Sequence, residues 1–247
     1  MFDIHVYTFV SVIIVSLISL VGVFTLGISD KWLSRMLHYL ISFSAGALLG
    51  DVFLHLIPEL SEKEFSPTTG MYFLLGVVIF FLLEKYILWH HAHDGHDEDI
   101  HATRYLTIFG DALHNFIDGL IIAASFLASV PLGIATTIAV VFHEIPQEIG
   151  QFAILVHGGW SKAKALLYNF VSALTAIVGA AIVLFFVPGI EDAPTFLLAF
   201  AGASFVYIAM SDIIPDLHKE KSVKKSIGQI AAFLIGIIIM WLLLMLE

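Results

Sequence analysis

The sequence contains no cysteine and little charge, since only 13% of its 247 residues are Asp, Glu, Lys or Arg. The absence of cysteine excludes disulfides, thiolate metal sites, iron–sulfur clusters and cysteine catalysis. Basic residues are especially scarce: 11 Lys and Arg stand against 21 Asp and Glu, for a formal net charge of -10. This balance excludes a nucleic-acid partner held by a basic surface, and it favours cations as ligands.

Apolar residues are abundant instead, at 59% of the chain, and the mean hydropathy is +0.96. A water-soluble domain of this size does not carry so much apolar surface. A membrane span needs about 20 apolar residues. Runs of that length predict eight spans, near residues 6–27, 36–60, 71–89, 104–129, 131–157, 163–187, 194–217 and 227–246. We therefore expect an all-α, multi-pass integral membrane protein with one domain over residues 1–247 and no soluble catalytic domain.

The basic residues predict the orientation, because cytoplasmic loops carry the excess of Lys and Arg. With eight spans, every Lys and Arg except Lys63 falls on one side of the membrane. Both termini are then outside, and the chain is expected in the cell membrane, which is the cytoplasmic (inner) membrane if the organism is prokaryotic. The first apolar run lacks a basic n-region and a small-residue cleavage site, so we expect a retained span rather than a signal peptide.

Two segments resemble each other and predict an inverted repeat. Residues 45–60 in the second span match residues 202–217 in the seventh, and each copy ends with a Pro followed by an acidic residue. The two spans cross the membrane in opposite directions under the predicted topology, which is the arrangement of repeats in transporters. Chance recurrence of short Gly-Ala and Ile-Pro motifs is the alternative.

Polar residues recur in the middle of the fourth and fifth predicted spans. The fourth carries Asp111, His114, Asn115 and Asp118, and the fifth carries His143, Glu144, Gln147, Glu148 and Gln151. At about 100° per residue, each set forms one stripe along a helix face. Four carboxylates facing lipid would cost on the order of 10 kcal/mol, so the stripes are expected to face the protein interior. Mixed imidazole and carboxylate ligands suit Zn, Fe(II), Mn or Co better than Ca or Mg.

The two stripes together resemble the paired signatures of the ZIP (Zrt/Irt-like protein) metal transporter family. The matching segments read H-N-F-I-D-G at residues 114–119 and H-E-I-P-Q-E at residues 143–148. They are most similar to the branch whose fifth helix reads H-E-x-P-H-E, and the similarity covers essentially the whole chain. The resemblance implies a transporter rather than an enzyme, which moves Zn²⁺, or Fe²⁺, Mn²⁺ or Cd²⁺, toward the cytosol through a site between spans 4 and 5.

The resemblance also implies the ligands. One metal site would use His114, Asp118, His143 and Gln147, a second would use Asn115, Asp118, Glu144 and Gln147, and Glu148 would flank them. The chain departs from the branch at Gln147, where His is usual, and at Gln151, where Asp is common. Because a neutral amide is a poorer ligand, we expect a weaker central site that holds a single metal. Pro146 is expected to free the backbone carbonyl of Phe142 and to kink the helix.

Further polar residues suggest a pathway to and from the site. The candidates are Asp111 and Gln151 beside the site, Asp51, His55 and Glu59 for entry, and Asp212 and Asp216 for exit. For His55, a packing role is the alternative. The connector over residues 90–103 is expected to be cytosolic, and its composition suits loose metal binding. Its histidines are His90, His91, His93, His96 and His101, and the alternative is a solvated loop that binds metal incidentally.

Two other functions remain open at this stage. An intramembrane zinc metalloprotease would use the H-E pair at residues 143–144, although Gln147 stands where its second His must be. A passive divalent-cation channel would share the same site. The expected partners are divalent metal ions and the lipid bilayer; the oligomeric state, a homodimer included, and any coupling ion stay open.

Overall fold

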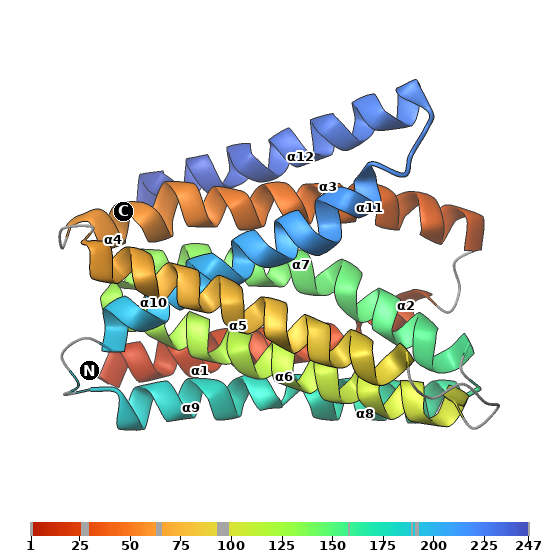
Figure 1. Cartoon of the computed structure of the whole chain (residues 1–247), viewed down its shortest axis with the longest axis horizontal. Coiled ribbons are helices and arrows are strands. Elements are labelled where there is room, and N and C mark those ends of the chain that lie inside the picture. Colours follow the sequence, from red (N-terminus) through yellow and green to blue (C-terminus); the bar gives the residue numbers. More distant parts are fainter. Residues whose placement is uncertain are drawn as a thin grey trace.

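The computed structural model describes residues 2–25, 30–62, 66–92, 99–157, 159–188, 190 and 193–246, and every regular element in these ranges is helical. The long helices run side by side in one bundle (Figure 1). The elements are α1 (Phe2–Ile18), η1 (Ser19–Val21), α2 (Gly22–Thr25), α3 (Asp30–Asp51), η2 (Val52–Leu56), α4 (Ile57–Glu62), α5 (Pro67–Ala92), α6 (Asp99–Ala128), α7 (Val130–His157), α8 (Lys162–Ala173), α9 (Thr175–Phe186), α10 (Ala193–Tyr207), η3 (Ile208–Ile213), α11 (Ile214–Leu217), α12 (Val223–Leu243) and η4 (Leu244–Leu246).

The prediction of an all-helical membrane protein is confirmed for the described residues. Seven stretches are long and apolar enough to cross a membrane: 3–24, 35–62, 67–85, 108–128, 162–186, 193–217 and 223–243. The predicted fifth span is not among them, although α7 is 28 residues long, because the polar residues at its centre lower its hydropathy. The fold therefore has seven or eight helices that suit a membrane.

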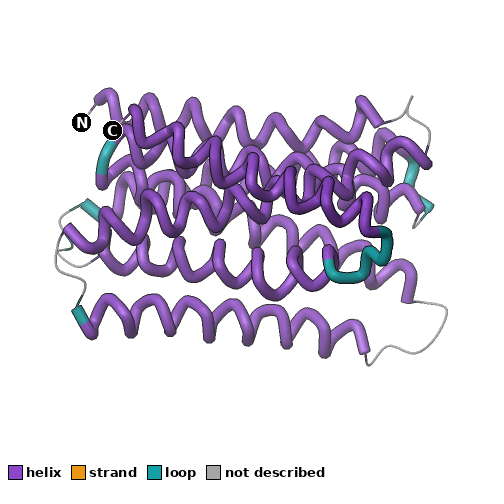
Figure 2. The backbone as a smooth tube through the Cα atoms, turned by 90° about the horizontal axis from the view of Figure 1, so that it is seen from above, coloured by secondary structure: helices purple, strands orange, loops and turns teal. Residues whose placement is uncertain are grey.

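The start of α1 and the end of α12 lie at the same end of the bundle, as Figure 2 shows from above. Figure 1 shows the same placement from the side. A chain that returns to the end where it began crosses the bundle an even number of times. The arrangement agrees with eight crossings, α7 being one of them.

The connector predicted over residues 90–103 is shorter than expected. Helix α5 continues to Ala92, and α6 already begins at Asp99, so His90, His91 and His101 belong to helices. The side chains of these three histidines lie outside the described part, as do residues 93–98 with His93 and His96. Hydropathy marks only the part of a helix that lies in lipid, whereas backbone hydrogen bonding continues beyond it.

Small residues allow the helices to approach closely. A Cβ atom on Gly119 of α6 would lie 1.9 Å from the carbonyl oxygen of Ala176, and one on Gly179 of α9 would lie 2.1 Å from that of Phe116. Between helices in a membrane, close packing of this kind replaces the hydrophobic effect as the main attraction. The α6–α9 pair is therefore held at a spacing that only glycine permits. Helix α6 carries the first of the two polar stripes.

Two π-helical turns occur at matching places in the predicted repeat. Helix α3 passes into the π-turn Val52–Leu56 two residues before Pro58, and α10 passes into the π-turn Ile208–Ile213 two residues before Pro215. A proline removes a backbone donor, and a π-turn shifts the helical register, a feature that is frequent at functional sites. The matched turns support the prediction that the two segments are repeats.

Candidate metal centre

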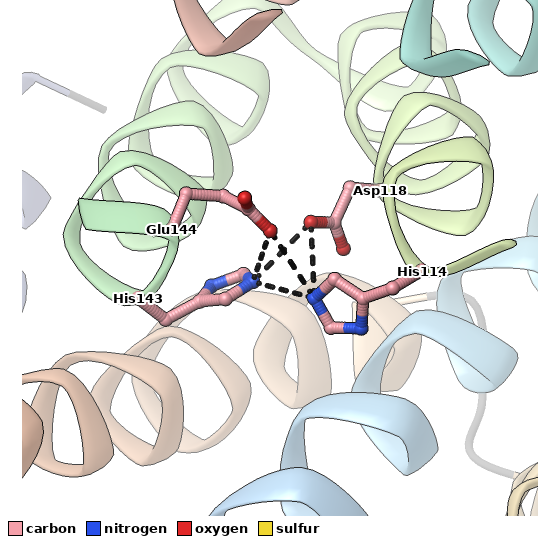
Figure 3. Close-up of side chains that lie close together, drawn as sticks. All are labelled: His114, Asp118, His143 and Glu144. Carbon is pink, nitrogen blue, oxygen red and sulfur yellow. Dashed lines mark hydrogen bonds and ion pairs between the residues drawn. The ribbon is translucent and has the colours of Figure 1, made fainter. Parts of the chain in front are cut away.

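Four side chains from two neighbouring helices meet inside the bundle (Figure 3). His114 and Asp118 lie four residues apart on one face of α6, and His143 and Glu144 are consecutive on α7. One ligand atom from each residue lies within 4.8 Å of the other three. We refer to these four residues as the metal centre.

Five of the six distances between the ligand atoms, those that involve an imidazole nitrogen, are close to the edges of a small tetrahedron. The two Nε2 atoms of His114 and His143 are 3.2 Å apart. His114 Nε2 lies 3.2 Å from Glu144 Oε1 and 3.5 Å from Asp118 Oδ2, and His143 Nε2 lies 3.2 Å from Asp118 Oδ2 and 3.5 Å from Glu144 Oε1. A tetrahedral zinc ion with bonds of about 2.0–2.1 Å needs edges of about 3.3–3.4 Å. The centre therefore has nearly the size that zinc requires.

The tautomer of His143 also suits metal binding. Its Nδ1 lies 3.2 Å from the carbonyl oxygen of Ala139, which can only accept a hydrogen bond. In the neutral ring with its proton on Nδ1, this hydrogen bond leaves the lone pair of Nε2 directed toward the other three ligands. A backbone carbonyl that holds the far nitrogen in this way is a common support for a metal-bound histidine.

The two carboxylates of the centre are buried, without a Lys or Arg among the described buried residues. The side chains of Asp118 and Glu144 are 1% and 0% exposed, and that of His114, at 18%, is the most accessible of the four. The buried polar and charged residues of the described part include no Lys or Arg. A divalent ion would neutralise the two carboxylates without any help from a basic side chain.

The amides of two further expected ligands, Gln147 and Asn115, each donate a hydrogen bond. The Gln147 amide donates a hydrogen bond to Glu144 Oε1 over 3.4 Å, so it presents nitrogen rather than oxygen toward the ligands. Asn115 is buried on α6, and its amide donates to the carbonyl oxygen of Asp111 over 3.2 Å. The structure thus brings together four of the six residues that the resemblance implied as ligands.

Glu148 and Asp111 lie beside the centre and contact helix α8. Asn169 donates to Glu148 Oε2 and Ser172 donates to Asp111 Oδ2, each over 2.5 Å. Asn169 and Ser172 were not among the site residues that the sequence predicted, and their spacing of three residues in an apolar span was the available signal. Gln151, one turn after Glu148 on α7, is also buried.

A cavity of about 260 Å³ leads away from the centre. Its lining consists of Ile41, Ser44, His143, Pro146, Gln147, Ile208, Ile213 and Asp216. It joins His143 to the π-turn η3 and to α11, which lies toward the end of the bundle opposite the two termini (Figure 1). Asp216, the predicted exit residue, is therefore brought to the same cavity as the centre, and it also pairs with Lys219 at 2.8 Å.

Two of the predicted entry residues, Asp51 and His55, are buried. His55 Nε2 lies 2.9 Å from the carbonyl oxygen of Met240 on α12. This contact supports the packing role for His55. Glu59, on α4, is partly exposed. The side chain of Asp212 lies outside the described part.

Comparison with known proteins gives a consistent result. A model of the ZIP zinc transporter family matches residues 2–103 and 88–244. Zinc transporter ZIP13 of Pongo abelii is 34% identical over 220 residues, which cover 83% of this chain and 66% of that protein. Zinc transporter zipt-7.2 of Caenorhabditis elegans is 33% identical over 272 residues, which cover 86% of this chain and 59% of that protein. Zinc transporter SLC39A7 of Mus musculus is 29% identical over 303 residues, which cover 86% of this chain and 63% of that protein. The chain thus spans between 59% and 66% of the length of these three relatives.

Proposed function

The chain belongs to the ZIP zinc transporter family, and from this membership and the metal centre we propose that it carries Zn²⁺ across a membrane toward the cytosol. One observation carries the proposal: four ligand atoms of the right chemistry, three of them on buried side chains, spaced 3.2–3.5 Å around each imidazole nitrogen. The zinc ion is the cargo, bound between α6 and α7 in a site from which bulk water is largely excluded.

The central site holds one ion in this proposal. The four residues of the metal centre supply four ligand atoms for one ion, and Gln147 donates a hydrogen bond to Glu144 instead of bridging to a second metal. Imidazole together with carboxylate admits Fe²⁺, Mn²⁺ and Cd²⁺ as competing cargo, because these ligands select by size and softness only weakly.

The direction of transport follows from the proposed topology. Eight spans with both termini outside place the opposite end of the bundle in the cytosol, and the cavity from His143 to Asp216 runs toward that end. The chain is a multi-pass membrane protein, and its Lys- and Arg-bearing connectors face the cytosol in this proposal. An ion in the centre would leave past Gln147 and Asp216.

The packing of the helices supports alternating access. Helices α1, α6, α7, α8 and α9 pack mainly on one another, and α3, α5, α10 and α12 form a second group. The metal centre belongs wholly to the first group, whereas the cavity beside it is lined by both groups. Movement of one group against the other would open and close the path to the centre, as in other transporters built from repeats.

The two alternatives are less well supported. A metalloprotease needs a second His one turn after His143, but Gln147 occupies that place and hydrogen-bonds to Glu144, the residue that would act as the base. A passive channel needs sites weak enough for rapid exit, whereas four buried ligands favour tight binding. Family membership favours neither alternative.

Metal uptake into proteoliposomes tests the proposal. Vesicles that contain the purified chain should accumulate Zn²⁺ or Cd²⁺ in a saturable manner, and His143→Ala and Asp118→Ala should each abolish uptake. His5→Ala is a matched control, because His5 lies on α1 and contacts the ring of Phe185, 5.9 Å between centroids. Uptake that persists in both centre variants, or no uptake with folded wild-type protein, would contradict the proposal.

A further inference from the structure

The aromatic ring of Phe205 packs on a ligand of the metal centre from the other helix group. Phe205 lies near the end of α10, and its side chain is 0% exposed. Its ring centroid is 5.7 Å from that of the His143 imidazole, with 65° between the ring planes. Aromatic rings prefer such edge-to-face contacts at about 4.5–7 Å. Since His143 belongs to α7 of the first group and Phe205 to the second, the contact crosses between the groups.

The imidazole of His143 needs neighbours to fix its orientation, because the χ2 torsion of histidine has broad minima. The hydrogen bond between Nδ1 and the carbonyl oxygen of Ala139 holds one atom of the ring, about which the ring can still tilt. The His114 ring, 5.4 Å away at 88°, is itself a ligand in the centre. His143 also lines the cavity of about 260 Å³, which leaves open space on one side of the ring. Phe205 therefore adds a constraint on the tilt that these neighbours do not provide.

The sequence around Phe205 holds its ring firmly. Small residues, Ala-Gly-Ala-Ser at 201–204, precede it on α10 and allow close packing with neighbouring helices. A Cβ atom on Gly202, for example, would lie 2.7 Å from the ring of Phe73. Phe205 itself belongs to the main hydrophobic cluster of the bundle. The ring is therefore a rigid support for the imidazole.

The predicted repeat shows that burial alone does not require a ring at this position. The match of residues 45–60 with residues 202–217 pairs Leu48 with Phe205. Both side chains are 0% exposed, and both belong to the same hydrophobic cluster. Leucine thus fills the equivalent place in the first copy. The second copy, whose side chain packs on a metal ligand, has an aromatic ring instead.

We propose that Phe205 is a positioning residue for His143: its ring fixes the tilt of the imidazole, so that Nε2 points at the ion. A binding site is precise when packing locks the rotamers of its ligands. Because Phe205 belongs to the second helix group, the ion is held most tightly in the relative position of the groups seen here. Movement of one group withdraws the ring and frees the imidazole. This consequence for transport rests on the proposed function.

The orientation of the imidazole can be measured without a metal. In the purified full chain with ¹⁵N-labelled histidine, nuclear magnetic resonance reports each imidazole, and His143→Ala identifies the signals of His143. Wild-type protein should give one set of His143 signals. Phe205→Leu introduces the residue of the first repeat, and it should broaden or double these signals because the imidazole samples more orientations.

The visible absorption of bound Co²⁺ reports the geometry of the loaded centre. Phe205→Leu should change the shape of the tetrahedral Co²⁺ bands and weaken Co²⁺ and Zn²⁺ binding about three- to tenfold, the range of one aromatic contact. Phe205→Tyr keeps the ring, so it should keep the wild-type bands, although its buried hydroxyl should lower the thermal stability. A purely structural role predicts the reverse, with the larger spectral change in the less stable variant.

Phe200→Leu is the matched control. Phe200 lies on the same helix and is 9% exposed, and its ring packs on that of Phe80 at 5.4 Å between centroids. This variant should keep the His143 signals and the Co²⁺ bands. A folded Phe205→Leu protein with wild-type signals and wild-type Co²⁺ affinity, or equal changes in Phe200→Leu, would overturn the positioning role.

Failure of the proposed function gives a different result. Folded wild-type protein that binds neither Co²⁺ nor Zn²⁺ would contradict the proposed function. Broadened His143 signals in the metal-free Phe205→Leu protein, with unchanged signals in Phe200→Leu, would still support the positioning of the imidazole by Phe205.

Discussion

The hydroxyl of Ser44 lies 2.7 Å from the backbone carbonyl oxygen of Phe142. Pro146, four residues further along α7, has no N–H to donate to that carbonyl. Ser44 on α3 offers a replacement donor, and its single hydroxyl proton is shared with the carbonyl oxygen of Leu40, which is also 2.7 Å away. Helix α7 continues through Pro146 without interruption. A residue of one helix group thus completes the hydrogen bonding of the other, one residue before His143.

Replacing Ser44 by Ala should destabilise the protein by about 1 kcal/mol, because the carbonyl of Phe142 loses its donor. Thermal unfolding in detergent measures the change. Ser125→Ala is the matched control: Ser125 is equally buried, but its hydroxyl bonds only to Ile121 within its own helix. An equal loss in both variants would mean that the contact between α3 and α7 has no special role.

Replacing Asp118 by Asn, or Glu144 by Gln, removes a charged ligand of the metal. Substitutions of residues that only support the ligands weaken metal binding roughly 10–100-fold, so we expect a larger loss of zinc affinity here. Competition with a chromophoric chelator measures the dissociation constant. The carboxylate-to-amide change Glu84→Gln controls for altered folding, since Glu84 lies on α5 and is absent from the centre. Zinc affinity within a few-fold of the wild type in either centre variant would refute the assignment.

Replacing Gln147 by His should strengthen zinc binding and slow its release. Gln147 lines the cavity next to His143, and its amide already reaches Glu144 over 3.4 Å, so an imidazole there adds a ligand. We expect about a tenfold gain in affinity, equivalent to about 1.4 kcal/mol, with a lower maximal uptake rate. Binding and uptake are measured on the same preparation, and unchanged affinity would show that the side chain at this position does not reach the ion.

Replacing Gly119 by Ala should destabilise the α6–α9 pair by about 1–3 kcal/mol, the usual cost of overpacking. The new Cβ would lie 1.9 Å from the carbonyl oxygen of Ala176, which is backbone and cannot rotate away. Gly150→Ala is the control, because nothing lies within 4 Å of its Cβ position. Since Ala favours helix by roughly 0.5–1 kcal/mol over Gly, that variant should be slightly stabilised. Thermal unfolding measures the stability of both variants. Equal stability of Gly119→Ala and Gly150→Ala would contradict the close contact between α6 and α9.

The sequence predicted the metal centre through local patterns. His114 and Asp118 are four residues apart in a helix, so they share a face whatever surrounds them. His143 and Glu144 sit at the middle of an apolar run, where burial without a cation is costly. These arguments need only the geometry of one helix and the chemistry of its side chains.

Contacts between helices were not predicted from the sequence. The contact of Ser44 with Phe142, and the contacts of Asn169 with Glu148 and of Ser172 with Asp111, join residues distant in the chain. They depend on how far each helix is rotated and shifted along its neighbour. Hydropathy does not encode rotation or depth, which explains why Gln147 was expected to be a ligand although its amide donates to Glu144.

The sequence by itself determined the class of this protein, an all-helical membrane protein with two inward-facing polar stripes, because hydropathy and the helical period are local properties. Only the tertiary structure decided which four atoms approach to 3.2–3.5 Å around the imidazoles and which carboxylates turn to α8. Close packing at Gly119 and Gly179 sets the spacing of α6 and α9, and that spacing depends on the whole bundle.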